Sequence, residues 1–497
     1  MTPKPHAALI LVGHGSTLNP DSSEPTHRHA DALRASGLFA EVACCFWKEE
    51  PNLRDVWEMV ESRVIYVVPN FISEGYFCQE VLPRELGLDG AITHRGDRII
   101  YYCDPVGIHP NMRQLLLHRA EEVAPGLPRD QTSLVIVGHG TSLNDNSVKA
   151  IQDQVQRIRE TGEFAEVIDA YMEQPPLVAE WDQLTQAPNV VVVPFFIADG
   201  LHSYQDIPVL LGILEETSPA LSQGGGFGQN PHTLRGRQLY YSGAIGTDAR
   251  MDSVILDQVV AFDAAHHISH PAAETEPPPS RIEKALIGLL ADGPAWIGQV
   301  QIEPLPEGRF RLRHIADANA PLESLCLHEH PSAAREIARS TGEGAFRPLH
   351  SAADLNTGWR LEIGSIAELR LALDFLYPAA VGCWIAQREE GLQGTPLRTF
   401  LGRQTGMYRF ANTIRDDQAL DLVCQQCAKG CLRRILWPLA ADQPLTGPAA
   451  NRAETGAGTL PGIDSRRAIP LLCIEPCPLI PGAARKIARA NAETPPA

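Results

Sequence analysis

The sequence lacks an apolar run of membrane-spanning length and lacks any excess of positive charge. A membrane helix needs about 20 consecutive, predominantly apolar residues, and none of the 497 residues lies in such a stretch. Lysine and arginine total 42 against 60 aspartates and glutamates, a formal net charge of −18. We therefore expect a soluble, cytoplasmic protein that binds neither membranes nor nucleic acid, and in which a polyanionic substrate needs a local cationic pocket. The amino-terminal apolar run from Ala7 to Val12 is too short for a secretory signal and predicts a first strand.

Two segments of the chain are copies of one unit. Residues 11–42 and 136–167 align without a gap at an offset of 125, and thirteen of the 32 positions are identical, including Gly-His-Gly. In each copy an apolar run ends at that motif. This pattern predicts a buried strand, a tight turn, and a histidine at the strand's carboxyl end.

Each copy repeats the order strand, helix four times. In the second copy we predict strands near 133–138, 165–171, 189–195 and 237–243, and helices near 146–160, 176–186, 204–216 and 249–262. Strands that alternate with helices are typical of parallel sheets covered on both faces. We predict two tandem doubly wound α/β domains, residues 1–127 and 128–265, which are related by a pseudo-twofold axis and face each other across a cleft.

Three metal-capable side chains follow strands of the second copy. His139 follows the first strand, Glu173 the second and His202 the third. Because ligands bind outside the carboxyl ends of parallel strands, we expect the three at one sheet edge. Two imidazoles and a carboxylate suit Co²⁺, Fe²⁺ or Zn²⁺. The alternative is that Gly-His-Gly is only a turn, with its histidine bonded to the backbone.

The first copy keeps only part of this set. At the offset of 125, His14 matches His139, whereas Lys48 stands opposite Glu173 and Phe77 opposite His202. One intact and one degraded set indicates duplication followed by specialisation. His14 and Lys48 are therefore candidate accessory residues, with a structural or substrate-contact role as the alternative.

The second half of the chain divides into a linker, a small domain and a cysteine-rich segment. Residues 266–280 contain Pro277-Pro278-Pro279 and predict a semi-rigid linker. Residues 281–412 predict an α+β domain, with a helix over 281–290, a hairpin of 297–302 and 309–315, and helices near 332–340 and 365–377. Its weak basicity argues against a DNA-binding winged helix and favours a stabilising or docking role.

Residues 413–497 hold five of the eleven cysteines, namely Cys424, Cys427, Cys431, Cys473 and Cys477. In a reducing compartment such crowding favours metal or cluster binding over disulfides. Thiolates at two- and three-residue spacings can reach different irons of one cubane, so four of the five predict a 4Fe-4S cluster. We favour Cys424, Cys427 and Cys477, with Cys431 and Cys473 contending for the fourth position. A structural zinc site is the alternative.

The first half of the chain resembles the class II tetrapyrrole chelatases, in particular the sirohydrochlorin cobaltochelatases. The resemblance rests on the strand followed by Gly-His-Gly-Ser/Thr, on Tyr-Met-Glu-x-Pro at 171–175, and on Val-Val-Pro-Phe-Phe-x-x-x-Gly-x-His at 192–202. It covers residues 7 to about 263. The cysteine spacing and domain order also resemble longer chelatase-like proteins with an appended iron–sulfur domain.

The resemblance implies an enzyme that inserts a divalent metal into a tetrapyrrole without ATP. It assigns metal binding and catalysis to His139, His202 and Glu173. The expected function is insertion of Co²⁺ into sirohydrochlorin or a close relative in cobalamin biosynthesis. The alternatives are ferrochelation towards siroheme and, in another class, a non-catalytic tetrapyrrole- or metal-binding sensor that uses the cluster.

Overall fold

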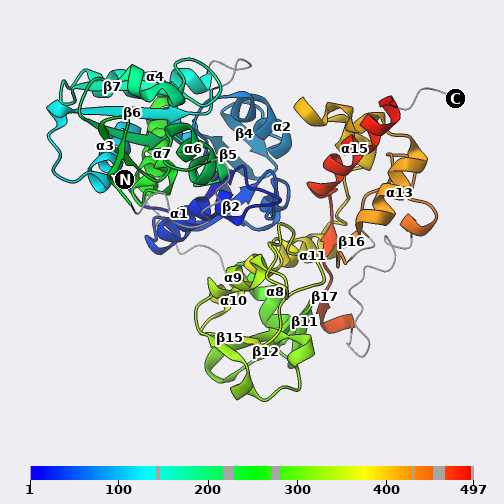
Figure 1. Ribbon diagram of the computed structural model, residues 1–497. Coiled ribbons are helices and arrows are strands. Elements are labelled where there is room, and N and C mark those ends of the chain that lie inside the picture. Colours follow the sequence, from blue (N-terminus) through cyan, green and yellow to red (C-terminus); the bar gives the residue numbers. More distant parts are fainter. Residues whose placement is uncertain are drawn as a thin grey trace. The chain divides into compact units, whose positions relative to one another are not determined.

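The computed structural model describes residues 2–140, 146–215, 229–269, 280–427, 430–450 and 465–493 (Figure 1). The chain divides into two compact units. The first contains residues 1–15, 21–46 and 62–276, and the second contains 16–20, 47–61 and 277–497. Two short segments from the amino-terminal half therefore fold with the carboxyl-terminal unit.

The first unit contains two five-stranded sheets of the same topology, ordered β2-β1-β3-β5-β4 and β7-β6-β8-β10-β9. The strands are β1 (Lys4–Gly13), β2 (Phe39–Phe46), β3 (Val64–Pro69), β4 (Ile92–Arg95), β5 (Arg98–Tyr102), β6 (Thr132–Gly138), β7 (Glu166–Tyr171), β8 (Asn189–Pro194), β9 (His232–Leu234) and β10 (Arg237–Tyr241). Four strands of each sheet are parallel, which confirms the doubly wound α/β prediction. The sequence analysis did not include β4 and β9, each of which adds a short antiparallel strand at the edge of its sheet.

The helices of the first unit are α1 (Glu24–Ala35), α2 (Leu82–Leu86), α3 (Met112–Val123), α4 (Asn146–Arg159), α5 (Trp181–Leu184), α6 (Ile207–Leu211) and α7 (Met251–His266). Two predicted helices were too long. Over 176–186 the chain forms only a 3-10 turn and the single turn α5. The pattern near 204–216 begins with a π-helical turn, η7 (His202–Asp206), and its helix α6 stops at Gly212, whose φ is +82°. A left-handed glycine at this position ends a helix.

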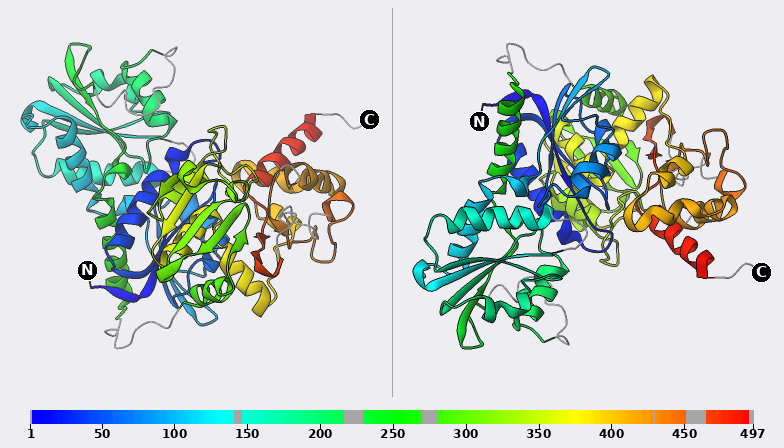
Figure 2. Two further views of the ribbon diagram at one scale, coloured as in Figure 1. Left: turned by 90° about the horizontal axis from the view of Figure 1, so that it is seen from below. Right: turned by 90° about the horizontal axis from the view of Figure 1, so that it is seen from above.

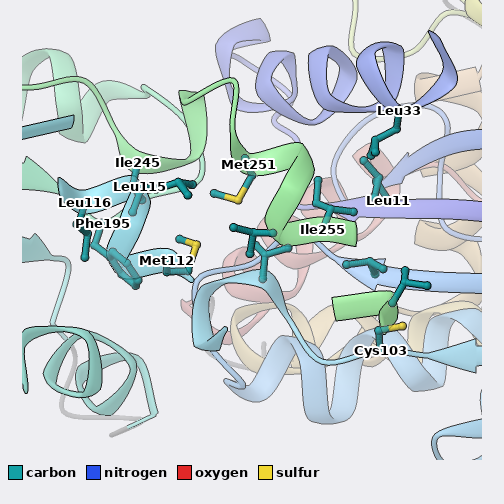
Figure 3. Packing of buried hydrophobic residues seen from close by; sticks show 14 of the residues in the cluster. Leu11, Leu33, Cys103, Met112, Leu115, Leu116, Phe195, Ile245, Met251 and Ile255 are labelled. Carbon is teal, nitrogen blue, oxygen red and sulfur yellow. The ribbon is translucent and has the colours of Figure 1, made fainter. Parts of the chain in front are cut away.

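The last helix of each half packs on the sheet of the other half. Helix α3 lies against β8 and α4, while α7 lies against β3 and α1. Figure 3 shows Met112 and Leu115 of α3 beside Phe195, which follows β8, and Ile255 of α7 near Leu11 of β1. All five side chains are buried. The two halves therefore share one hydrophobic core through exchanged helices, a feature that the repeat alone does not reveal.

One glycine in each half marks a close backbone approach that supports the loop after the third strand. A Cβ on Gly107 would lie 1.9 Å from the Ile72 carbonyl oxygen, and a Cβ on Gly246 would lie 2.2 Å from the Ile197 carbonyl oxygen. No side chain fits at either position. The contact recurs at the same place in both copies, so it fixes the start of the loop that leads to His202.

The second unit contains a six-stranded sheet, ordered β14-β15-β13-β12-β11-β17, whose green strands run side by side in Figure 2. The strands are β11 (Ala295–Ile297), β12 (Val300–Pro304), β13 (Phe310–His314), β14 (Cys326–His328), β15 (Trp359–Ile363) and β17 (Ala468–Ile469). The predicted α+β character and the hairpin of β12 with β13 are confirmed. Strand β17 comes from the cysteine-rich segment and pairs with β11, so that segment completes the sheet.

Four helices accompany this sheet, namely α8 (Arg281–Leu290), α9 (Ala333–Arg339), α10 (Ile366–Leu376) and α11 (Ala380–Glu389). Ser280 and Ser365 cap α8 and α10 by accepting the main-chain N–H three residues on, as expected of serine at an N-cap. Within the described ranges no single helix is long and apolar enough to cross a membrane. Helices α10 and α11, bent by 99°, reach that length and apolarity only as a pair.

The part of the second unit from Leu397 onward has a small core of its own, which includes residues that precede the cysteine-rich segment. It is built from α12 (Leu397–Gly402), α13 (Asp416–Cys427) and α15 (Leu479–Glu493), together with the short parallel strands β16 (Arg434–Ile435) and β18 (Leu472–Cys473). Buried Leu401, Leu422, Trp437 and Ile480 belong to this core, and Cys477 packs against it.

Residues 47–61 are held in the second unit by buried charges. Arg433 Nη2 lies 3.0 Å from Glu50 Oε1, and its Nη1 lies 3.3 Å from Asp55 Oδ2. The three side chains are 10%, 3% and 1% exposed, respectively. Gly382 of α11 approaches the same segment so closely that a Cβ would lie 1.9 Å from the Glu58 carbonyl oxygen. The segment is therefore an integral part of this unit.

Candidate functional site

His139 stands at the carboxyl end of β6 between two glycines that the packing requires. A Cβ on Gly138 would lie 2.2 Å from Ile151 Cδ1. Gly140 has φ +75°, and a Cβ there would lie 2.9 Å from Tyr171 Cβ. Only glycine tolerates both the contacts and the left-handed backbone. The turn therefore presents His139 at the sheet edge with its side chain 41% exposed.

The backbone fixes the tautomer of His139. Its Nδ1 lies 2.9 Å from the Gly140 carbonyl oxygen. A carbonyl oxygen only accepts hydrogen bonds, so Nδ1 carries the proton and Nε2 keeps its lone pair. His14 makes the same contact with Gly15, at 2.8 Å. Both Gly-His-Gly turns thus present an imidazole whose Nε2 can bind a metal or accept a proton.

Glu173 is brought to His139 by the end of β7. The main-chain N–H groups of Met172 and Glu173 donate to the His139 carbonyl oxygen, each at 3.1 Å. The Glu173 carboxylate Oε2 lies 3.6 Å from His139 Nδ1, and its side chain is 62% exposed. The acid is therefore a solvent-exposed neighbour of the first imidazole rather than a packed one.

His202 completes the set from the third strand. Its ring centroid lies 5.0 Å from that of His139, in an edge-to-face arrangement at 79°. Its Nδ1 lies 2.6 Å from Asp206 Oδ2. A carboxylate also only accepts, so Nδ1 of His202 is protonated and Nε2 is the nitrogen with the lone pair.

A half-buried acid, Asp199, stabilises the loop that carries His202. Asp199 Oδ1 accepts the main-chain N–H of Ala244 at 2.7 Å. Burial raises the pKa of Asp199, while hydrogen bonds from Ala244, Ser203 and Thr247 act in the opposite direction. The loop is thus tied to the segment after β10 from two sides, by this hydrogen bond and by the contact of Gly246 with Ile197.

The structure brings His139, Glu173 and His202 together at one sheet edge, but not into a closed ligand set. Within the described ranges, no three histidine, cysteine, aspartate or glutamate side chains stand close enough to hold an ion as they lie. His139 contacts each of the other two. All three side chains are between 41% and 62% exposed and therefore open to solvent at the sheet edge.

The equivalent residues of the first copy have other surroundings. His14 lies edge-to-face with Phe77, at 5.3 Å between ring centroids. Lys48 belongs to the second unit, where its Nζ donates to the Tyr408 hydroxyl at 2.8 Å and lies 4.0 Å from that ring centroid. An accessory role for His14 and Lys48 stays a prediction.

Four of the five clustered cysteines, Cys424, Cys427, Cys473 and Cys477, pack against the small core of the second unit, and Cys431 is a neighbour of Cys473 and Cys477. None of the eleven cysteines forms a disulfide, and Cys326 alone among the six others is exposed. Burial raises the pKa of Cys473, Arg433 opposes the rise, and the nearby thiols of Cys431 and Cys427 add to it. Burial raises the pKa of Cys477 to about 12, with Cys431 again among its neighbours.

These thiols fit an iron–sulfur cluster. Trp437 Nε1 donates a hydrogen bond to Cys473 Sγ at 3.2 Å, and the main-chain N–H groups of Leu479 and Ile480 donate hydrogen bonds to the sulfur of Cys477. Such N–H donors and an apolar surrounding are what cluster sulfurs require. Cys424 lies one turn before Cys427 on α13 and is also half-buried. The sequence indicated the cysteines but not Trp437 or the role of residues 47–61.

Comparison with known proteins covers most of the chain. The family model CbiX matches residues 8–123 and 133–261, the DR2241 stabilising domain matches 284–388, and a 4Fe-4S iron-sulfur cluster binding domain matches 389–486. A probable sirohydrochlorin cobaltochelatase of Halobacterium salinarum is 41% identical over 270 residues, which is 50% of this chain and 90% of that protein. A sirohydrochlorin cobaltochelatase of Methanopyrus kandleri is 28% identical over 137 residues, 23% of this chain and 95% of that protein.

One solved structure matches nearly the whole chain. DR2241 from Deinococcus radiodurans is 27% identical, with a TM-score of 0.78, over 97% of this chain and 99% of that one. It is described as a multi-domain protein with structural similarity to chelatases and two additional novel domains. The chain therefore combines two chelatase-like halves, a stabilising domain and a 4Fe-4S-binding domain.

Proposed function

The chain belongs to the CbiX family of sirohydrochlorin chelatases, a class of enzymes, and on that premise we propose that it inserts Co²⁺ into sirohydrochlorin or a close tetrapyrrole without ATP, on the route to cobalamin. One observation carries the proposal. Two imidazoles lie 5.0 Å apart at one sheet edge, each with Nδ1 occupied by an acceptor and Nε2 left with its lone pair.

The reaction suits these groups. Metallation joins the divalent ion to four ring nitrogens and releases two pyrrole protons. A neutral imidazole can bind the incoming ion or accept a proton near neutral pH. We assign metal delivery and proton abstraction jointly to His139 and His202, and charge balance or uptake of the second proton to Glu173.

The choice of cobalt is the finer part of the proposal. Two nitrogens and one oxygen also suit Fe²⁺, so ferrochelation towards siroheme is the alternative within the class. The deciding assay mixes purified protein with sirohydrochlorin and either Co²⁺ or Fe²⁺ and follows the absorbance change of metallation. The metal with the larger kcat/KM is the substrate.

Histidine variants test the site. Loss of a positioned acid–base group costs typically about 10²–10⁴-fold in rate, so we expect H139A and H202A to slow metallation by about 100-fold or more. His94 is an exposed histidine on β4, and H94A is the matched control, expected to metallate like the wild type. Wild-type rates in both site variants would refute the assignment.

A tetrapyrrole sensor is the candidate from another class, motivated by Lys48 and Phe77 in place of ligands in the first copy. It predicts that the wild type binds sirohydrochlorin but does not accelerate metallation with either ion. Titration of the tetrapyrrole without metal, run beside the rate assay, separates the two functions.

We further propose that four of Cys424, Cys427, Cys431, Cys473 and Cys477 hold the 4Fe-4S cluster. When bound, the cluster supplies a one-electron redox centre, and the chain supplies thiolates, N–H donors and an apolar surrounding. Single cysteine-to-serine variants, purified anaerobically, identify the ligands by loss of iron, sulfide and visible absorbance. The fifth variant should keep its cluster. Stoichiometric zinc without sulfide in colourless protein would instead indicate a structural zinc site.

A further inference from the structure

We propose that Asp206 is a positioning residue that orients His202 and keeps its Nε2 available to the incoming metal. The inference rests on the proposed function of the same site. Asp206 Oδ2 lies 2.6 Å from His202 Nδ1, the shortest contact that either histidine of the site makes. A carboxylate behind a metal-binding imidazole fixes its tautomer and ring orientation and raises its basicity.

The local backbone places the two groups on the same side. His202 and Asp206 begin and end the π-helical turn η7, in which the Ile207 N–H donates to the His202 carbonyl oxygen. Single π-helical turns are frequent at functional sites. Helix α6 continues directly from Asp206, and its Ile207 and Leu211 are completely buried. Asp206 therefore sits on an anchored element, against which the half-exposed imidazole of His202 is oriented.

The first copy shows that the turn does not need this pair. The π-helical turn η3 (Phe77–Val81) occupies the same place, with Phe77 in the position of His202 and Val81 in that of Asp206. The backbone turn is kept while the imidazole and its carboxylate are both absent. A role in folding does not require the pair, which leaves orientation of the imidazole as its function.

The two imidazoles of the site are thus oriented in different ways. His139, like His14, bonds to a backbone carbonyl, and the Glu173 carboxylate lies farther from its Nδ1, at 3.6 Å. His202 instead bonds directly to a carboxylate, at 2.6 Å, and this contact holds its ring in one orientation.

Three substitutions at Asp206 remove different parts of its interaction with His202 and should weaken Co²⁺ binding to different extents. D206E keeps an acceptor and its charge, D206N keeps an acceptor without charge, and D206A removes both. We expect Co²⁺ affinity, measured by calorimetry without tetrapyrrole, to fall about 10–100-fold in D206A, less in D206N and least in D206E. The kcat of metallation should fall in the same order while KM for the tetrapyrrole stays unchanged. D153N, an exposed carboxylate on α4, is the matched control.

Nitrogen NMR of histidine-labelled protein gives a readout independent of metal and substrate. We expect His202 to be the Nδ1–H tautomer in the wild type and a tautomer mixture in D206A. Unchanged tautomer and unchanged Co²⁺ affinity in D206A would overturn the inference, whatever the activity. A wild type that shows the expected tautomer shift and cobalt binding but no metallation would refute the proposed function while supporting the role of Asp206.

Discussion

Replacing Asp55 by asparagine tests whether the buried charges around Arg433 set the pH dependence of stability in the second unit. Asp55 Oδ2 accepts from Asn52 Nδ2 at 2.7 Å and from Arg433 Nη1 at 3.3 Å, while Oδ1 has no partner among the described residues. Burial raises the pKa of Asp55 from 3.8 to about 7, Arg433 opposes the rise, and Glu50 adds to it.

The sign and size of the effect follow from linkage. Because the folded pKa lies above the unfolded one, the contribution of Asp55 is fully present below pH 3.8 and is lost as the pH rises through about 7. Between pH 5 and pH 8 the wild type should therefore lose about 3 kcal/mol relative to D55N, which mimics the protonated acid at every pH. Arg433 carries one positive charge, which balances the negative charge of Glu50 while Asp55 is protonated. An ionised Asp55 adds a second negative charge that Arg433 cannot balance.

Hydrogen exchange of the peptide covering residues 47–61 is the assay, because it reports local opening without requiring the whole chain to unfold in one step. After correction for intrinsic exchange rates, the opening equilibrium of the wild type should rise about 100-fold relative to D55N from pH 5 to pH 8. D442N, at an exposed aspartate, should follow the wild type. Parallel pH profiles of D55N and wild type would refute the reasoning.

Three further substitutions have definite expected results. G246A places a Cβ 2.2 Å from the Ile197 carbonyl oxygen and so displaces the loop before His202. Because small misplacements in an active site are costly, kcat for metallation should fall at least about tenfold. G107A, which makes the equivalent clash in the first copy, is the control and should lower kcat less. W437F removes the Nε1–H donor to Cys473 Sγ; with Cys473 as the fourth ligand, the cluster's reduction potential should become more negative in an EPR redox titration, whereas with Cys431 in that place it should stay nearly unchanged. L312A empties a fully buried position of the six-stranded sheet and should destabilise the second unit by about 2–5 kcal/mol in urea unfolding.

The sequence predicts the strands, and the convergence of His139, Glu173 and His202 at one sheet edge, because both depend on local patterns. The apolar run of β6 ends at Gly138, and the repeat offset identifies the residues after β7 and β8. The antiparallel strand β9 was missed because it has three residues and follows a glycine-rich stretch. The helix over 176–186 was overestimated because the backbone becomes extended at Thr185, three residues before Pro188, and the residue before a proline also disfavours the helical conformation.

Other features depend on tertiary contacts that no periodicity encodes. A 3.6-residue pattern shows that α3 and α7 each have a buried face, but it does not say which sheet covers that face. The contact between His202 and Asp206 could have been predicted from the sequence. Asp206 stands four residues after His202, and in the first copy both residues are replaced, by Val81 and Phe77. The binding of residues 47–61 by Arg433 could not be predicted, because it joins segments without any sequence pattern in common.

The ion pair between Arg433 and Asp55 also has a consequence for biosynthesis. The two residues are 378 positions apart, and a ribosome that adds about 5–20 residues per second needs roughly 20–75 s to cover that distance. During this interval each nascent chain carries Glu50 and Asp55 without the Arg433 side chain that contacts both of them in the folded unit. Holdase chaperones acting on the emerging chain, and premature termination before codon 433, should therefore matter more to this protein than its repeated first half alone would suggest.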